Sequence, residues 1–188
     1  MTEAFGVPLA IDAKIRDGSL RECAGDAGIP VILYEAGEAL RFEERDIRAG
    51  VKGIISVMRR IGMLPKSRSR KPPQAPIVSD QTSWLRAPES GILRSFVPLG
   101  DKVEKGQTIA IVADPLGVAE TPIIAPSDGV VIGRTNLPLV YEGDATFHVA
   151  RYGRKVAKVE KQVEEFQVEF QPDEATEIPK SSGEVPIA

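Results

Sequence analysis

Glu35 is the residue of this chain whose type and position best suit chemistry. Residues 29–34 are a run of β-branched and apolar residues that follows Gly28, a composition that predicts a short buried strand. Glu35 ends that run, and Ala36 and Gly37 follow at once. Active sites of open α/β sheets lie at the carboxyl ends of their strands, where a carboxylate can take and give protons. The pattern alone leaves a second interpretation open, a solvated residue at a strand end.

The elements around this strand alternate between helix and strand signals. Ser19 is an N-cap candidate for a short helix over residues 20–27, which ends at Gly28. A longer helix begins at residue 42 and ends at Gly62, and one face of it is apolar: Ile47, Val51, Ile54, Ile55, Met58 and Ile61. Two helices and one or two strands cannot cover both faces of a parallel sheet. Residues 1–65 are therefore predicted to be the carboxyl-terminal part of a longer α/β catalytic domain.

The remainder of the chain divides into three further segments. Residues 66–82 are basic and proline-rich, which predicts a solvated linker in preference to a phosphate-binding segment. Residues 83–152 contain short β-rich runs and turn signals, and the segment 87–93 recurs as 125–131, which predicts a β-sandwich built from two similar halves. Asp114 begins the turn between the halves. Residues 153–188 predict a short amphipathic helix or a frayed extension, followed from Gln171 by a disordered acidic tail.

Composition excludes several classes of protein. The net charge of −3 gives no basic field for nucleic acid or an anionic membrane, and no apolar run has the ~20 residues of a membrane-spanning helix. Cys23 is the single cysteine, which excludes an internal disulfide and fits a reducing compartment. The amino terminus lacks the pattern of a signal peptide. The expected location is the cytoplasm.

Two resemblances follow from these segments. Gly-Asp-Lys-Val-Glu-Lys-Gly-Gln at 100–107 and Ala-Pro-Ser-Asp-Gly at 125–129 resemble the biotinyl/lipoyl-type barrel-sandwich hybrid, although the turn between the halves has no lysine to modify. The order of the whole set (the 28–37 segment, the helix ending at Leu64 and the repeated β unit) is similar to the carboxyl-terminal half of the succinylglutamate desuccinylase/aspartoacylase family. Those proteins are zinc-dependent amidohydrolases related to zinc carboxypeptidases.

That resemblance implies a role for two residues. In the family, a glutamate at the end of this strand acts on the zinc-bound water, and Glu35 is the match; Glu38 is more simply a loop charge. An arginine on the preceding helix binds a substrate carboxylate, and Arg21 is the nearest candidate, with an exposed helical arginine as the alternative. Cys23 fits a small packing residue better than a nucleophile. The implied substrate is an N-acyl amino acid or a similar small amide.

The chain departs from the family in its metal ligands. The family's zinc ligands are a His-x-x-Glu pair and a later histidine, whereas this chain has one histidine, His148, in an alternating β run that predicts a half-exposed strand residue. The polypeptide alone is therefore predicted to be inactive, as a truncated or split form that lacks the ligand segment. Two functions stay open: part of a zinc deacylase, or a non-catalytic binding or assembly module. The expected partners are further copies of the chain, as a homo-oligomer, or an upstream complementing fragment.

Overall fold

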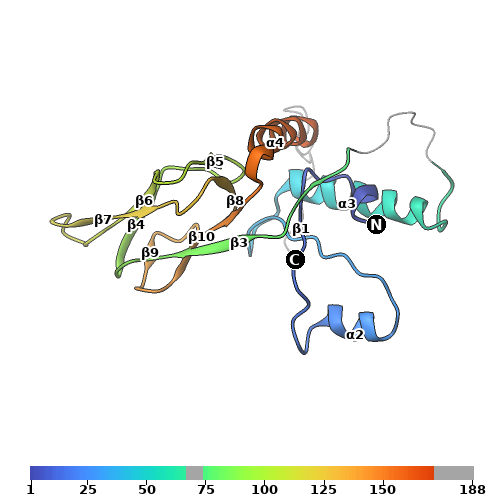
Figure 1. Cartoon of the computed structure of the whole chain (residues 1–188), viewed down its shortest axis with the longest axis horizontal. Coiled ribbons are helices and arrows are strands. Elements are labelled where there is room, and N and C mark those ends of the chain that lie inside the picture. The colour runs from blue at the N-terminus through green and yellow to red at the C-terminus, as the bar shows by residue number, and fades with distance from the viewer. Residues whose placement is uncertain (67–73, 172–188) are drawn as a thin grey trace, which may run out of the picture.

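The computed structural model describes residues 1–66 and 74–171. Its amino-terminal part contains α1 (Thr2–Phe5), β1 (Leu9–Ile11), α2 (Leu20–Asp26) and α3 (Glu44–Arg60). The Ser19 hydroxyl accepts a hydrogen bond from the Glu22 backbone N–H at 3.2 Å, so the predicted N-cap of α2 is present. Figure 1 shows α2 set apart from the other elements, and none of its residues is buried.

Helix α3 packs through its small residues and not through its large ones. Ala49, Gly50 and Gly53 are its buried positions. A Cβ added at Gly53 would lie 2.6 Å from the ring of Phe5, and one added at Gly50 would lie 3.1 Å from the ring of Tyr34. The two aromatic rings, 5.0 Å apart, therefore sit where α3 has no side chains. Most of the predicted apolar stripe is exposed, with Ile47, Val51 and Ile54 at 44%, 53% and 56%.

The predicted strand over residues 29–34 is absent, which corrects the sequence analysis. These residues form no regular structure, and Ile29 and Leu33 are 59% and 64% exposed. A buried strand of a parallel sheet exists only where neighbouring strands pair with its N–H and C=O groups and helices cover it. Within the described residues, no strand pairs with this segment, and Ile29, Val31 and Leu33 remain exposed while the Tyr34 ring packs on α3.

The second half of the chain forms two four-stranded antiparallel sheets. One has the strand order β3-β10-β8-β5 and the other the order β7-β6-β4-β9. The strands are β3 (Thr82–Arg86), β4 (Gly91–Ser95), β5 (Lys102–Val103), β6 (Thr108–Ala113), β7 (Glu120–Ile124), β8 (Gly129–Arg134), β9 (Leu139–Val140) and β10 (Ala145–Ala150). The internal repeat relates β3 to β7, β4 to β8, β5 to β9 and β6 to β10. When each strand is replaced by its counterpart, the order of one sheet becomes the order of the other. The arrangement is thus a mixed α/β fold with two antiparallel sheets, and its assignment as a barrel-sandwich hybrid stays a prediction.

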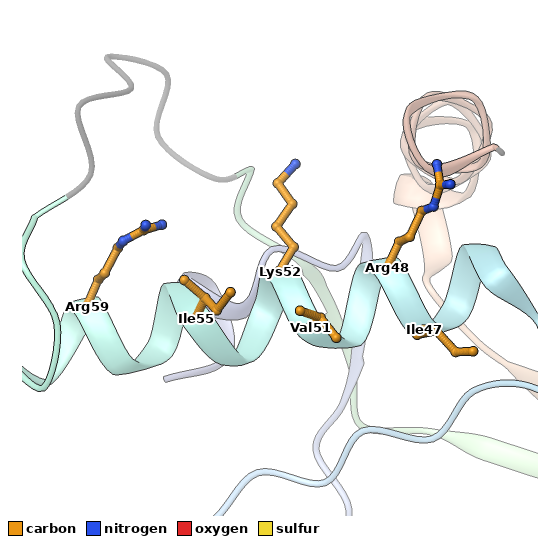
Figure 2. A pocket seen from close by; sticks show the side chains of 6 residues that line it. All are labelled: Ile47, Arg48, Val51, Lys52, Ile55 and Arg59. Atoms are coloured by element: carbon orange, nitrogen blue, oxygen red, sulfur yellow. The ribbon is translucent and has the colours of Figure 1, made fainter. Parts of the chain in front are cut away.

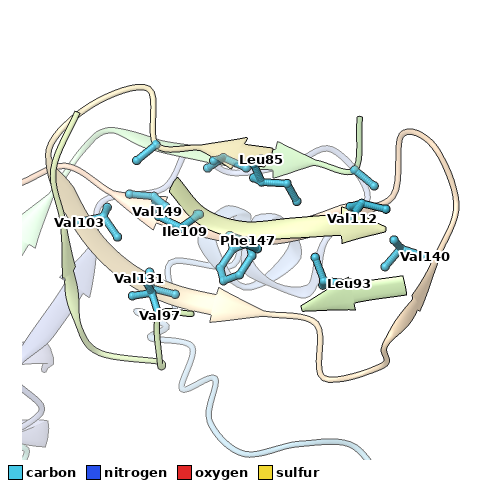
Figure 3. Packing of buried hydrophobic residues seen from close by; sticks show 14 residues of the cluster. Leu85, Leu93, Val97, Val103, Ile109, Val112, Val131, Val140, Phe147 and Val149 are labelled. Atoms are coloured by element: carbon cyan, nitrogen blue, oxygen red, sulfur yellow. The ribbon is translucent and has the colours of Figure 1, made fainter. Parts of the chain in front are cut away.

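The main core lies between these two sheets (Figure 3). Phe147 is fully buried at its centre, surrounded by aliphatic side chains from both sheets: Leu85, Leu93, Val97, Val103, Ile109, Val112, Val131, Val140 and Val149. Between β6 and β7, the Asp114 carboxylate accepts hydrogen bonds from the backbone N–H groups of Leu116 and Ala119. These bonds hold the pKa of Asp114 below its usual value and close the predicted turn.

Two further elements cover the edge of this core. Residues Ile77–Ser79, which the sequence analysis places in the linker, form β2 and pair in parallel with β1. Helix α4 (Val156–Phe170), preceded by the 3₁₀ turn η1 (Gly153–Lys155), buries Val159 and Val163 against Val130 and Ile77. The basic part of the linker at 67–73 and the acidic tail beyond Gln171 lie outside the described residues. The domain boundaries remain a prediction.

Candidate functional site

Glu35 lies in the irregular segment between α2 and α3, and its side chain is exposed. It does not stand at the end of a strand, because residues 29–34 do not form one. A carboxylate works as a general acid or base in amide chemistry when other groups shield it from solvent, and within the described residues Glu35 has no such cover.

His148 is the group of most interest near Glu35. Burial lowers the pKa of the His148 imidazole below its ordinary value, and the negative charge of Glu35 acts in the opposite direction and raises it. Within the described residues, Glu35 is the charged side chain whose field acts on this ring. The negative charge of the sequence-predicted carboxylate thus acts on the single histidine from a segment far away in the chain.

His148 stacks on one aromatic neighbour, Trp84, on the outer face of the β3-β10-β8 sheet. In the strand register, His148 of β10 pairs with Trp84 of β3 on one side and with Gly133 of β8 on the other. The Trp84 and His148 rings stack, with centroids 4.3 Å apart and planes within 11°. A Cβ added at Gly133 would lie 3.3 Å from the Cβ of His148, so a side chain there would crowd the imidazole. Trp84 remains 50% exposed.

Strand β10 is irregular on both sides of His148. Its register against β3 shifts between Ala145 and Phe147, and its register against β8 shifts between His148 and Val149. Such bulges twist a strand locally and re-aim a side chain, and they are frequent beside active sites. Here Phe147 and Val149 point into the core while His148 points outward. This agrees with the prediction of a half-exposed strand residue.

The other two sequence candidates stay apart from this cluster. The Arg21 guanidinium donates to the backbone oxygen of Lys14 at 3.2 Å, and among the described ion pairs none joins it to Glu35. Arg21 as a ligand for a substrate carboxylate therefore stays a prediction. Cys23 is an exposed free thiol on α2, so it does not pack into a core as expected.

A catalytic zinc does not fit the residues that the structure describes. Such a site needs three protein ligands of the His, Cys or carboxylate type, close together. No group of three or more His, Cys, Asp and Glu residues in the described ranges could hold a metal ion. His148, the only histidine, is stacked on Trp84, and with Glu35 it would give at most two of the three ligands that a catalytic zinc requires.

Sequence reasoning missed the pairing of Trp84 with His148. Both residues are the only ones of their type in the chain, but they lie in separate strands and nothing local indicates their register. One signal in the sequence could have indicated this pairing: the internal repeat, because equivalent strands of the two halves are expected to pair in the same way. A tryptophan on an outward-facing strand position is the second signal, since the largest apolar side chain then remains half in water.

Comparisons with known proteins place this arrangement among solved structures. No protein-family model and no curated protein matches the sequence. A succinylglutamate desuccinylase/aspartoacylase from Rhodobacter sphaeroides is similar in structure, with 23% identity and a TM-score of 0.67, over 80% of this chain and 47% of that one. The apo ectoine utilization protein EutE (DoeB) from Ruegeria pomeroyi is similar with 21% identity and a TM-score of 0.70, over 79% of this chain and 48% of its own.

An aspartoacylase family protein from Mesorhizobium loti is also similar, with 22% identity and a TM-score of 0.59, over 80% of this chain and 45% of that protein. The chain thus spans about half the length of the solved structures it matches. The resemblance inferred from the sequence is confirmed at the level of the fold. This chain has the fold that structures of the succinylglutamate desuccinylase/aspartoacylase family show over about half of their length.

Proposed function

We propose that this chain is part of an amidohydrolase that removes acyl groups from N-acyl amino acids or similar small amides, with Glu35 as its general acid/base. The observation that carries the proposal is the shared fold, which includes about 80% of this chain but only about half of each matched structure. The other half of the fold, either continuous with this chain or on a separate polypeptide, would complete the site.

The role of Glu35 follows from amide chemistry. Hydrolysis requires a base that takes a proton from the attacking water and an acid that gives one to the leaving amine, and one carboxylate can do both in turn. Such a carboxylate works best with a pKa close to neutral, which requires partial burial. Glu35 is exposed here, so a covering surface from the other half would supply that burial.

The exposed face of α3 supports the need for a covering partner. Figure 2 shows Ile47, Val51 and Ile55 along one groove of the helix, with the basic side chains of Arg48, Lys52 and Arg59 beside them. Val51 and Ile54 are 53% and 56% exposed, although helix faces of this kind are normally buried. Because Arg48 and Lys52 already pair with Glu44 and Glu169, it is the exposed apolar face itself that favours a covering partner.

The test is reconstitution of activity. The 188-residue chain is mixed or co-expressed with a polypeptide that carries the other half of the fold, and release of free amine from a panel of N-acetyl amino acids is measured. We expect activity from the mixture and none from this chain alone. Glu35→Gln should abolish turnover while Glu38→Gln, an exposed carboxylate three residues away, should leave it unchanged. Hydrolysis by the chain alone that a chelator abolishes, or full activity of E35Q, would contradict the proposal.

The exposed face of α3 also favours a second candidate, a non-catalytic binding or assembly module. In that case two copies or a different protein would cover the helix, and no amide would be hydrolysed.

Light scattering of the purified chain separates the two candidate functions. A dimer that Val51→Lys converts to a monomer, together with failed reconstitution of activity, would favour the binding or assembly module.

Over the described part of the chain, no helix is long and apolar enough to cross a membrane.

A further inference from the structure

The groove on α3 lies beside the end of α4. Its lining residues are Ile47, Arg48, Val51, Lys52, Ile55 and Arg59. The Lys52 ammonium pairs with the carboxylate of Glu169 and lies 4.7 Å from the centre of the Phe170 ring, and Phe170 is the last residue of α4. The chain that follows α4 therefore starts next to this groove.

The sequence that follows α4 is first acidic and then apolar. Asp173, Glu174 and Glu177 carry carboxylates, and Ile178 comes directly after them. A short segment of this composition cannot form a core of its own, so it buries its apolar side chains only by binding to another surface. Residues 173–178 thus combine negative charge with an apolar side chain, and the groove combines positive charge with apolar side chains.

Arg59 is the basic group of the groove that this segment is suited to meet. Arg48 and Lys52 already pair with acidic residues of α3 and α4, whereas Arg59 takes part in none of the ion pairs within residues 1–66 and 74–171. Figure 2 shows Lys52 and Arg59 pointing to the same side of α3. The helix rise places Arg59 about 10 Å beyond Lys52. Glu174 follows Phe170 by four residues, a reach of about 13 Å for an extended chain.

We propose that residues 173–178 bind in the α3 groove of the same chain, with a carboxylate on Arg59 and Ile178 against Val51 and Ile55. Val51 is 53% exposed, and contiguous apolar surface of this kind is normally covered. A partner that docks on α3 must displace this segment, which makes the segment an intramolecular competitor for that face. The inference goes beyond the proposed function and does not depend on it, because the binding needs neither turnover nor a second polypeptide.

The tether favours this segment over a second copy of the chain. A segment joined by a few residues to the edge of its binding site has an effective concentration on the order of millimolar. A second copy is present at its actual concentration in solution, which is far lower in a dilute sample. Weak contacts, such as one exposed ion pair and one apolar side chain, therefore suffice within the chain but not between chains.

The experiment measures how close the segment comes to the groove in the full-length chain. The exposed Cys23 thiol is removed by Cys23→Ser, and a nitroxide spin label is attached through Thr176→Cys. Methyl resonances are then recorded by nuclear magnetic resonance in a dilute sample. We expect the label to broaden the resonances of Val51 and Ile55. The resonances of Leu116, which is 87% exposed in the distant turn between β6 and β7, should stay sharp.

Two arginine variants test the contact itself. Arg59→Gln should lower the equilibrium constant for binding about two- to fivefold, the scale of one exposed ion pair, and so reduce the broadening. Arg60→Gln is the matched control, since Arg60 is the next residue and does not line the groove. Raising the salt concentration from about 0.1 M to about 1 M should also reduce the broadening, because it screens the ion pair.

Three results would overturn the proposal. The first is equal broadening of Val51 and Leu116, and the second is an equal effect of R59Q and R60Q. The third comes from a mixture in which one chain carries the spin label and another carries the isotope. Broadening between these chains as strong as broadening within one chain would show that a second copy fills the groove.

Discussion

The indole of Trp84 lies flat against the imidazole of His148, with ring centroids 4.3 Å apart and planes within 11° of each other. This stack exists because β3 and β10 pair so that the two residues are direct neighbours on the outer face of the sheet. It shields one face of the imidazole from water, which contributes to the burial that lowers the His148 pKa. The same contact makes the tryptophan an optical reporter of the histidine.

The lowered pKa of His148 predicts a pH dependence of stability. The unfolded chain binds the histidine proton more readily than the folded chain does, so the stabilisation is complete above the unfolded pKa of about 6.5. It is lost as the pH falls from that value through the lower, folded pKa. Urea unfolding at about pH 7.5 and about pH 5.5 should show a larger loss of stability in acid for the natural chain than for His148→Gln. Equal losses in both would contradict the lowered pKa.

The charge of Glu35 predicts a second titration result for His148. Because the negative charge of Glu35 raises the His148 pKa, Glu35→Gln should lower that pKa further, as followed by the ring resonances of His148. Glu38→Gln serves as the control, since Glu38 is not among the groups that act on the imidazole. An unchanged pKa in E35Q would mean that residues 29–36 do not lie beside the sheet in solution.

The packing of α3 on Phe5 predicts that an alanine is harmful where helix propensity favours it. In an exposed helix, Gly→Ala is stabilising by about 1 kcal/mol. At Gly53 the new Cβ would lie 2.6 Å from the Phe5 ring, so this buried ring must shift, and we expect Gly53→Ala to destabilise the chain by about 1–3 kcal/mol. Gly25→Ala in α2, where no atom lies within 4 Å, should instead stabilise it. Thermal unfolding of the two variants checks the sign of each change.

The two-sheet core predicts opposite outcomes for two phenylalanines. Phe147 is fully buried between the sheets, so Phe147→Ala should cost about 3–5 kcal/mol of unfolding free energy. Phe42 is 98% exposed, and Phe42→Ala should change stability by less than about 0.5 kcal/mol. Urea unfolding followed by circular dichroism measures both. A large loss in F42A would show that another surface covers Phe42 in solution.

Features that depend on neighbours in sequence were predictable. The Ser19 cap, the course of α3 and the Asp114 turn each depend on residues within a few positions, where propensity and hydrogen-bonding groups act directly. The β repeat was visible because each copy repeats the same alternation of apolar residues and turns. The strand predicted at 29–34 failed for the opposite reason: its pattern favours a strand, but a strand also needs partners to pair with.

The sequence by itself therefore determined the local elements, the β repeat and the identity of Glu35 as a carboxylate after an apolar run. Only the tertiary structure decided which face of α3 is buried and that His148 stacks on Trp84. These relationships join residues far apart in the chain, and they depend on strand register and on the shape of the packed surfaces. No periodicity within one segment encodes them, because each arises from the fit between segments.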